Sequence, residues 1–176
     1  MKAILFFAIF IISAFAIDFN KLNPYKDADF KILEDNLESF VANCKARDGK
    51  SCSLASITYF RKYKKSGYDI ELGKLTLDYA LKGCELKDGG SCYIVATEYG
   101  YIARHHRIVQ ENYEKEMEYL LKGCDYNYIY ACYSLGHHYY MESLEKADKE
   151  KKEAEIRAKQ FYKKACDLGD EFACKK

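Results

Sequence analysis

Eight cysteines in evenly spaced pairs constrain the fold of this chain more than any other feature. The two cysteines of each pair stand eight residues apart, and equivalent pairs repeat every 40 to 42 residues. Many pairings are open to eight cysteines, but equivalent repeats are expected to form equivalent bonds. The sequence therefore predicts four short-range disulfides: Cys44–Cys52, Cys84–Cys92, Cys124–Cys132 and Cys166–Cys174.

The residues that follow each pair repeat as well. A small residue stands four positions after the second cysteine, and a tyrosine stands seven positions after it. Residues three or four apart share one face of an α-helix, so both are expected on a buried stripe. The small residue would let a second helix approach, and the tyrosine would fill the space beside it. The small residues are Ser56, Ala96 and Gly136, and the tyrosines are Tyr59, Tyr99 and Tyr139.

This repeat predicts a stack of two-helix units, because one such unit cannot bury its own apolar face. The presence of one proline among 176 residues also favours helices. We expect an N-terminal capping helix at about 30–50, then units near 51–90, 91–130 and 131–172. Helices are expected at 30–44, 51–63, 72–86, 91–104, 111–125, 130–145 and 152–168.

Two segments depart from the repeat. Tyr126–Tyr130 lacks the Asp and Gly residues of the other turns, so this third turn is expected to be packed against the body of the protein. The charged linker at 141–151 is longer than its counterparts, which predicts either an extended helix or a solvated bulge. The linker lies within the third unit and accounts for the 42-residue step between the last two cysteine pairs.

The N-terminus has the pattern of a signal peptide, and 1–16 is excluded from the fold. Lys2 precedes an apolar run, and Ala14-Phe15-Ala16 fits the usual cleavage rule. The run is too short to span a bilayer, which needs about 20 apolar residues. We expect cleavage after Ala16, a mature repeat domain at 17–176 with no membrane segment, and a secreted or periplasmic location, where disulfides persist.

The motifs together resemble a known family. Leu135-Gly136-His137-His138-Tyr139 matches the L-G-x-x-Y signature of helical-hairpin repeats. With the cysteine spacing, the chain resembles Sel1-like repeat proteins, relatives of the tetratricopeptide repeat, and among them the Helicobacter cysteine-rich family. The resemblance covers about 30–176. It implies an all-α solenoid of disulfide-stapled two-helix repeats, and as an alternative function weak β-lactamase or penicillin-binding activity, with a β-lactam or a peptidoglycan-derived peptide as ligand.

The sequence itself assigns no catalytic residue. Serine β-lactamases use a Ser-x-x-Lys motif, and the one match, Ser143-Leu-Glu-Lys146, lies in the charged linker without a Ser-Asp-Asn or Lys-Thr-Gly partner. Enzymatic activity therefore rests on the resemblance alone. The chain also lacks Cys-x-x-Cys, the motif typical of thiol oxidoreductases.

No metal, cofactor or nucleic acid is expected as a ligand. His105–His106 and His137–His138 are adjacent pairs, and adjacent residues on a helix point about 100° apart, which disfavours ligation of one ion. A net charge of +1 does not provide the concentrated basic surface that nucleic-acid binding needs.

The leading hypothesis is a scaffold that binds a protein or peptide. In tetratricopeptide-type hairpins the first helix of each unit lines a concave groove, and positions one, five and eight after the second cysteine share one helix face. Tyrosine gives a large contact area at low entropy cost, although several of these side chains could instead complete the core. The groove candidates are Ser53, Ile57, Phe60, Tyr93, Thr97, Gly100, Tyr133, His137 and Tyr140.

Overall fold

The computed structural model describes residues 18, 21–22, 26–100 and 108–176. The expected signal peptide at 1–16 and the pair His105–His106 lie outside the described residues. Within the described ranges the chain is helical and contains no strand. The helices are α1 (Asp27–Asp35), α2 (Leu37–Lys45), α3 (Gly49–Lys65), α4 (Ile70–Glu85), α5 (Gly89–Tyr99), α7 (Tyr113–Asp125), α8 (Ile129–Glu145), α9 (Asp148–Asp167) and the short 3-10 helix η2 (Ala173–Lys175).

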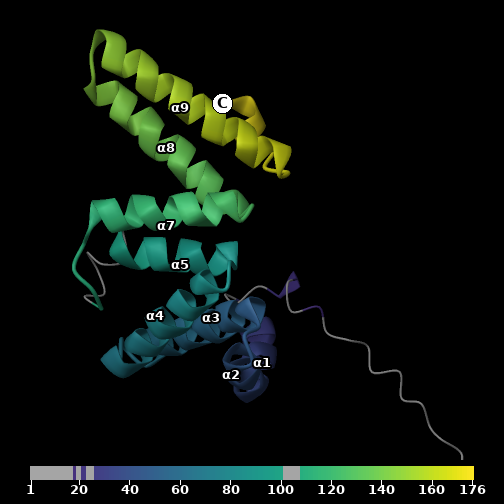
Figure 1. The fold of residues 1–176 in the computed structure, drawn as a ribbon. Helices are drawn as coiled ribbons and strands as arrows, with labels where there is room; N and C mark the ends of the chain where they lie inside the picture. The colour runs from purple at the N-terminus through teal and green to yellow at the C-terminus, as the bar shows by residue number, and fades with distance from the viewer. Residues whose placement is uncertain (1–17, 19–20, 23–25, 101–107) are drawn as a thin grey trace, which may run out of the picture.

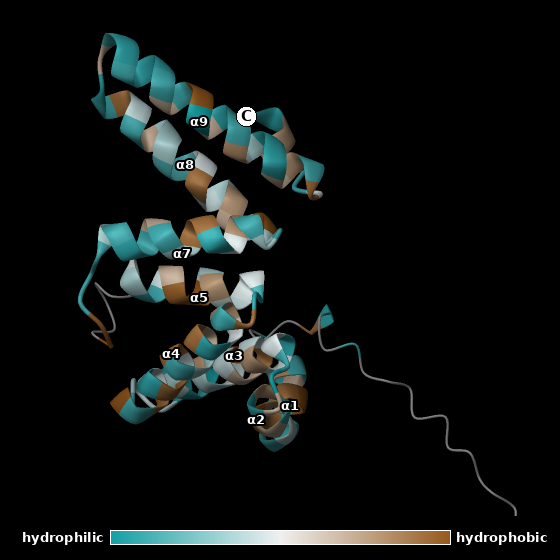
Figure 2. Ribbon diagram, in the orientation of Figure 1, coloured by the Kyte–Doolittle hydropathy of each residue, from teal (hydrophilic) through white to brown (hydrophobic). Residues whose placement is uncertain are grey.

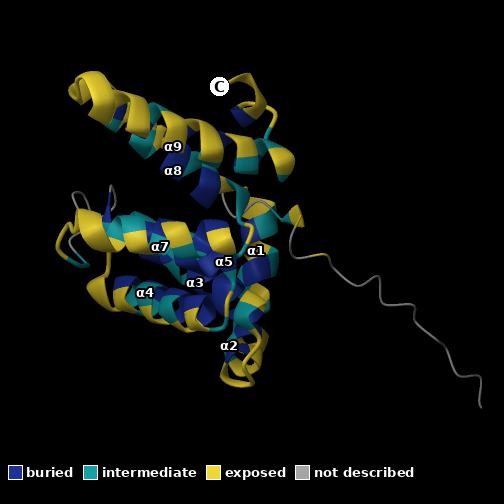
Figure 3. Ribbon diagram, turned by 45° about the horizontal axis from the view of Figure 1, so that its top comes forward, coloured by how far each residue is buried: buried dark blue, intermediate teal, exposed yellow. Residues whose placement is uncertain are grey.

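Successive helices form antiparallel pairs that stack into an elongated body (Figure 1). Helix α3 pairs with α4, α5 with α7, and α8 with α9, and the pairs meet where α4 contacts α5 and where α7 contacts α8. Buried residues line the faces between neighbouring helices, and exposed residues follow the outer faces (Figure 3). The stack of two-helix units that the repeat predicts, and the all-α solenoid that the resemblance implies, are confirmed.

The disulfides join one helix to the next at four junctions: α2 to α3, α4 to α5, α7 to α8, and α9 to η2. Each bond links two cysteines eight residues apart, and the described residues contain no free cysteine. The first cysteine lies in the last turn of one helix, and the second lies near the start of the helix that follows. The expected pairs are confirmed as Cys44–Cys52, Cys84–Cys92, Cys124–Cys132 and Cys166–Cys174.

The four turns that carry these disulfides share one backbone conformation. Each contains a residue with positive φ, and in three of the turns an aspartate then caps the next helix by accepting backbone N–H groups, which satisfies donors that a helix start leaves free. In the third turn Tyr128 replaces the aspartate. It is half-buried, as is Tyr126, whereas Tyr130 is 60% exposed, so the expectation of a packed turn holds for part of the segment.

Two expected helices differ in the structure. The segment 30–44 divides into α1 and α2 at Asn36, whose backbone leaves the helical region and whose side-chain amide donates to the Ile32 carbonyl at 2.8 Å. A side chain that bonds to nearby backbone competes with helix continuation. The helix expected at 91–104 ends at Tyr99, because Gly100 adopts a non-helical φ of −94° and ψ of −119°.

The charged linker at 141–151 extends both neighbouring helices. Helix α8 continues to Glu145 and α9 starts at Asp148, so two residues connect them. Of the two alternatives left by the sequence, the extended helix is therefore confirmed. Figure 2 shows that α9 is largely hydrophilic along its length, as a solvated outer helix requires.

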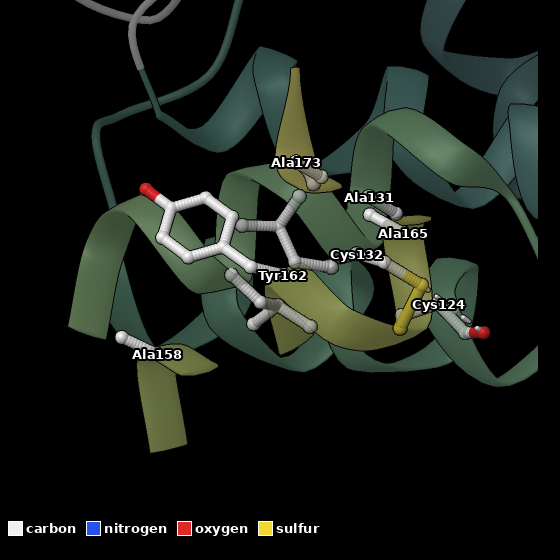
Figure 4. Packing of buried hydrophobic residues seen from close by; sticks show 10 residues of the cluster. Cys124, Ala131, Cys132, Ala158, Tyr162, Ala165 and Ala173 are labelled. Atoms are coloured by element: carbon white, nitrogen blue, oxygen red, sulfur yellow. Dashed lines mark hydrogen bonds between the residues drawn. A yellow bond between two sulfur atoms is a disulfide. The ribbon is translucent and has the colours of Figure 1, made fainter. Parts of the chain in front are cut away.

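The core of the C-terminal half is packed around small residues. Leu120, Leu135 and Tyr162 are buried in one cluster that also contains five alanines. Figure 4 shows Tyr162 with Ala158, Ala165 and Ala173 from this cluster. At Gly136 an added Cβ would lie 2.7 Å from the Tyr162 ring, so the helices approach closely at the position where the sequence predicts a small residue. The buried cluster consists of Ala96, Leu120, Cys124, Ala131, Cys132, Leu135, Ala158, Tyr162, Ala165 and Ala173.

One disulfide is much more accessible than the others. Cys174 is exposed and Cys166 is half-buried, whereas no other cysteine is more than 6% exposed. Thiol–disulfide exchange requires access to a sulfur atom, so a mild thiol reductant is expected to open Cys166–Cys174 first. Alkylation followed by peptide mass mapping tests this order. Labelling of Cys44 or Cys84 before Cys166 would contradict it, and the Cys166→Ala/Cys174→Ala variant, which lacks this bond, is the control.

Candidate functional site

The groove candidates on α3 have little exposed surface. Ser53 is 2% exposed and lies against the start of α5, so burial gives it a packing role and leaves it no surface for a ligand. Ile57 and Phe60 are half-buried. The Phe60 ring lies 6.5 Å from the Tyr63 ring and beneath the Lys64 ammonium group, so contacts within α3 cover part of it.

On α5 the candidates are divided between a tyrosine cluster and buried positions. The Tyr93 ring lies 5.4 Å from that of Tyr128 and 6.3 Å from that of Tyr130. We call these three residues the tyrosine cluster. Thr97 is half-buried and its hydroxyl donates to the Ile94 carbonyl. Gly100 is buried beneath a side chain of α7. Tyr93 is therefore the candidate by which α5 contributes to an aromatic surface, as part of the tyrosine cluster.

Helix α8 presents the largest exposed share of the candidates. His137 is exposed, Tyr140 is 47% exposed, and Tyr133 is half-buried, with its ring edge-on to that of Tyr162 at 5.4 Å. Tyr130 and Leu144, at 60% and 58% exposure, extend the same line. We call Tyr130, Tyr133, His137, Tyr140 and Leu144 the α8 stripe.

The α8 stripe has alternating steps of three and four residues, which place all its members on one face of the helix. Sequence reasoning missed Tyr130 and Leu144 as surface residues. The signal was present as a second apolar periodicity on α8, beside the one that marks its buried face. Met141, also exposed, borders the stripe.

The tyrosines expected beside the small residues hold the helices of each pair together. The ring of Tyr59 stacks on Tyr79 at 5.4 Å, and that of Tyr99 on Tyr119 at 6.1 Å. Tyr139 stacks in the same way on the ring of an α9 phenylalanine. These tyrosines therefore have the packing role that the repeat predicts, and the surface aromatics belong to other positions.

The Ser-x-x-Lys match lacks the geometry of a catalytic pair. Ser143 is 1% exposed, and its hydroxyl donates to the Tyr140 carbonyl at 2.6 Å. The Lys146 ammonium group lies 3.7 Å from a Glu150 carboxylate oxygen. Both side chains thus have other partners, and the serine does not reach the surface.

The two histidines of α8 point to different surroundings. His137 faces solvent, whereas His138 is half-buried, with Nε2 3.3 Å from a carboxylate oxygen of Glu116. The Tyr113 ring lies edge-on to His138, and burial raises the pKa of this tyrosine. This divergence agrees with the expectation for adjacent helical residues. No group of three or more candidate ligands that could hold a metal occurs in the described ranges.

A small charged pocket lies where α8 and α9 meet. Its volume is about 110 Å³, below the roughly 300 Å³ at which small-molecule sites begin. Its walls carry carboxylates and cations, two of which are paired with each other. The lining residues are Glu142, Lys146, Glu150, Glu153, Ala154 and Arg157.

One of three comparisons with known proteins found a solved structure with a similar architecture. No protein-family model matches the chain, and no curated protein does. A solved structure that matches is Helicobacter pylori cysteine rich protein B, with a TM-score of 0.56 and 23% sequence identity over 87% of this chain and 98% of that chain. The chain shares the all-α, disulfide-stapled repeat fold of that cysteine-rich protein. At this identity the likeness concerns the fold, and it confirms the architecture that the motif resemblance implies.

The fold and its bonds agree with a location outside the cytoplasm. Four disulfides are compatible with an oxidising compartment. Among the described helices, none combines the length and the apolar character that crossing a bilayer requires.

Proposed function

We propose that this chain is an exported scaffold that binds a segment of another protein through the α8 stripe and the tyrosine cluster. The observation that carries the proposal is the line of exposed aromatic and apolar side chains on a helix whose other face is buried. Exposed aromatics that adjoin one another are typical of binding surfaces, because they supply large contact areas with few rotatable bonds.

The placement of these side chains favours a helical partner segment. An extended peptide laid across the stack would need exposed side chains on α3, α5 and α8, but the candidates on α3 are buried or half-buried. The stripe instead runs along α8 from Tyr130 to Leu144, a length of about 21 Å at 1.5 Å per residue. Its three-four spacing matches the seam by which one helix packs along another.

The tyrosine cluster continues this surface across the junction between two helix pairs. Tyr130 belongs to both sets, and it lies 6.3 Å, ring to ring, from Tyr93 on α5. A segment seated on α8 would therefore touch the preceding pair as well. The partner we propose is an amphipathic helix whose apolar face carries side chains at three-four spacing.

Export is the second part of the proposal. It is supported by the signal pattern at 1–16 and by the four disulfides. We propose cleavage after Ala16, with function in the periplasm or outside the cell. Amino-terminal sequencing of the mature protein tests this, with Ile17 as the expected first residue.

Replacing Tyr130, Tyr140 and Leu144 together by alanine is expected to weaken binding of the partner at least tenfold, because exposed aromatic anchors supply much of the energy of such contacts. The partner is first identified with the oxidised protein, using a photo-crosslinking residue placed at Tyr140. The variant is then compared with wild type by affinity measurement. All three side chains are exposed, so the fold should tolerate their loss.

The matched control is the Ile156→Ala/Phe172→Ala variant, which removes apolar side chains that are 57% and 74% exposed and lie outside the stripe. It should bind the partner as wild type does. Equal weakening by both variants, or capture that the triple variant leaves intact, would rule out the α8 stripe as the binding surface.

A further inference from the structure

Glu98 is a carboxyl group buried inside the stack. It lies near the end of α5 with 0% of its surface exposed, and neither carboxylate oxygen has a hydrogen-bond partner in the described part of the chain. Burying an unpaired carboxylate is strongly unfavourable, whereas the protonated acid is far less so. Tyr63 of α3 is buried nearby: burial, and secondarily the charge of Glu98, raises the pKa of Tyr63.

The repeat shows which helix Glu98 faces. It stands six residues after Cys92, the position that His138 has after Cys132. His138 crosses the junction between pairs and contacts Glu116 of α7. By the 40-residue step, the α4 residue equivalent to Glu116 is Thr76, which is buried and whose hydroxyl donates to a carbonyl of its own helix. By this equivalence, the α4 position expected opposite Glu98 carries a hydroxyl and no cation.

A covalent bond fixes the junction between α4 and α5 at one of its two ends. The Cys84–Cys92 disulfide lies there, and Gly83 approaches Ser91 so closely that an added Cβ would overlap its hydroxyl. Glu98 lies six residues further along α5, about 9 Å away at 1.5 Å per residue. A charge at this end can separate the two helices, while the disulfide holds the other end.

We propose that the α4/α5 junction is a pH-sensitive hinge, closed when the Glu98 carboxyl is protonated and loosened when it loses its proton. The geometry that carries this is the buried, unpaired carboxyl opposite the covalent end of the junction. Loosening would change the angle between the α3/α4 pair and the pairs that follow. The aromatic surface on α5 and α8 belongs to those later pairs and would move with them.

The surroundings of Glu98 favour its protonated form. Burial raises the pKa of Glu98 from an ordinary value of 4.5 to about 7. On α3, Tyr63 lies close enough for the charge of Glu98 to raise its pKa, and the repeat equivalence puts the non-titrating Thr76 on the α4 side. Beyond Gly100 lies the Glu116 carboxylate of α7, which pairs with His138 of α8. The stability that a protonated Glu98 contributes is therefore complete below about pH 4.5, and it is lost as the pH rises towards 7.

Hydrogen exchange of the oxidised protein tests the hinge. Between about pH 5 and pH 8, and after correction for the intrinsic exchange rate, the opening constant of amides in α4 and α5 should rise by up to roughly 70-fold, which is the part of the effect of this change in pKa that falls within that range. The Glu98→Gln variant keeps the shape without the charge, and its opening constant should not change over this range. The α8/α9 pair is the internal reference and should respond less than α4 and α5.

A control variant and an NMR titration test the hinge further. Glu116→Gln removes the carboxyl at the next junction and should leave the pH response of α4/α5 in place. Titration of the Glu98 carboxyl carbon by NMR in the wild-type protein needs no variant and should give a midpoint near 7. A midpoint near 4.5, or a Gln variant whose α4/α5 amides respond to pH as wild type does, would overturn the hinge.

Discussion

Reduction of all four disulfides is expected to unfold the helix stack. Each bond closes a loop between cysteines eight residues apart, and in the chain-entropy model a loop of this size stabilises the folded state by about 2.5 kcal/mol. Four such bonds sum to roughly 10 kcal/mol, which equals the entire stability of many small domains. Far-UV circular dichroism of the oxidised and reduced protein during urea unfolding measures the loss.

Single bonds can be removed to separate the contributions. Replacing Cys124 and Cys132 by alanine is expected to lower the free energy of unfolding by about 2.5 kcal/mol, because alanine deletes the bond without burying an unsatisfied hydroxyl. The Cys166→Ala/Cys174→Ala variant removes a bond that closes a loop of the same length, but that bond attaches only η2 to α9. A reduced protein that keeps its helicity and its cooperative transition would show that the disulfides are dispensable for the fold.

Enlarging Gly136 to leucine is expected to destabilise the protein by about 3 kcal/mol. The space beside Gly136 is already filled by the Tyr162 ring, with three ring carbons 2.7 to 2.9 Å from the position of an added Cβ. Overpacking of this kind forces side chains off their rotamers or moves the helices apart. Because Tyr162 is 4% exposed and packed against Tyr133, the ring has little room to move. Urea unfolding of the oxidised variant gives the magnitude.

A second substitution identifies the cause. Combining Gly136→Leu with Tyr162→Ala should recover part of the loss, so that the double variant is more stable than the sum of the two single effects implies. Gly136 does not have a positive φ, so its substitution tests crowding alone. Gly169 has a φ of +106° and no atom within 4 Å of an added Cβ, so its substitution shows backbone strain without crowding. Strict additivity of the two substitutions would mean that contact with Tyr162 is not the reason for the small residue at position 136.

Much of the architecture could be predicted because the repeat carries two independent signals. The cysteine spacing determines where helices meet, and the small residues Ser56, Ala96 and Gly136 mark the buried face of each first helix. All three are buried in the structure. Equivalent positions in a repeat have equivalent surroundings, so one period sufficed to predict four disulfides and the pairing of helices.

The remaining features depend on neighbours that the period does not specify. The break at Asn36 depends on one side-chain bond to the backbone. Ser53 has a groove position by helix register, but the start of α5 covers it. Exposure of Tyr130 and Leu144 depends on which face of α8 the neighbouring helices leave uncovered. Glu98 could not be identified from the sequence as buried and unpaired, because both properties depend on the residues that surround it in the folded stack.

The most direct test of the fold is the disulfide map of the mature protein, obtained by mass spectrometry of peptides cleaved without reduction. The structure predicts that every cysteine is bonded to the one eight residues away, giving Cys44–Cys52, Cys84–Cys92, Cys124–Cys132 and Cys166–Cys174. Free thiols in the mature protein, or peptides that link cysteines from different turns, would contradict the stapled stack and the binding surface that it positions.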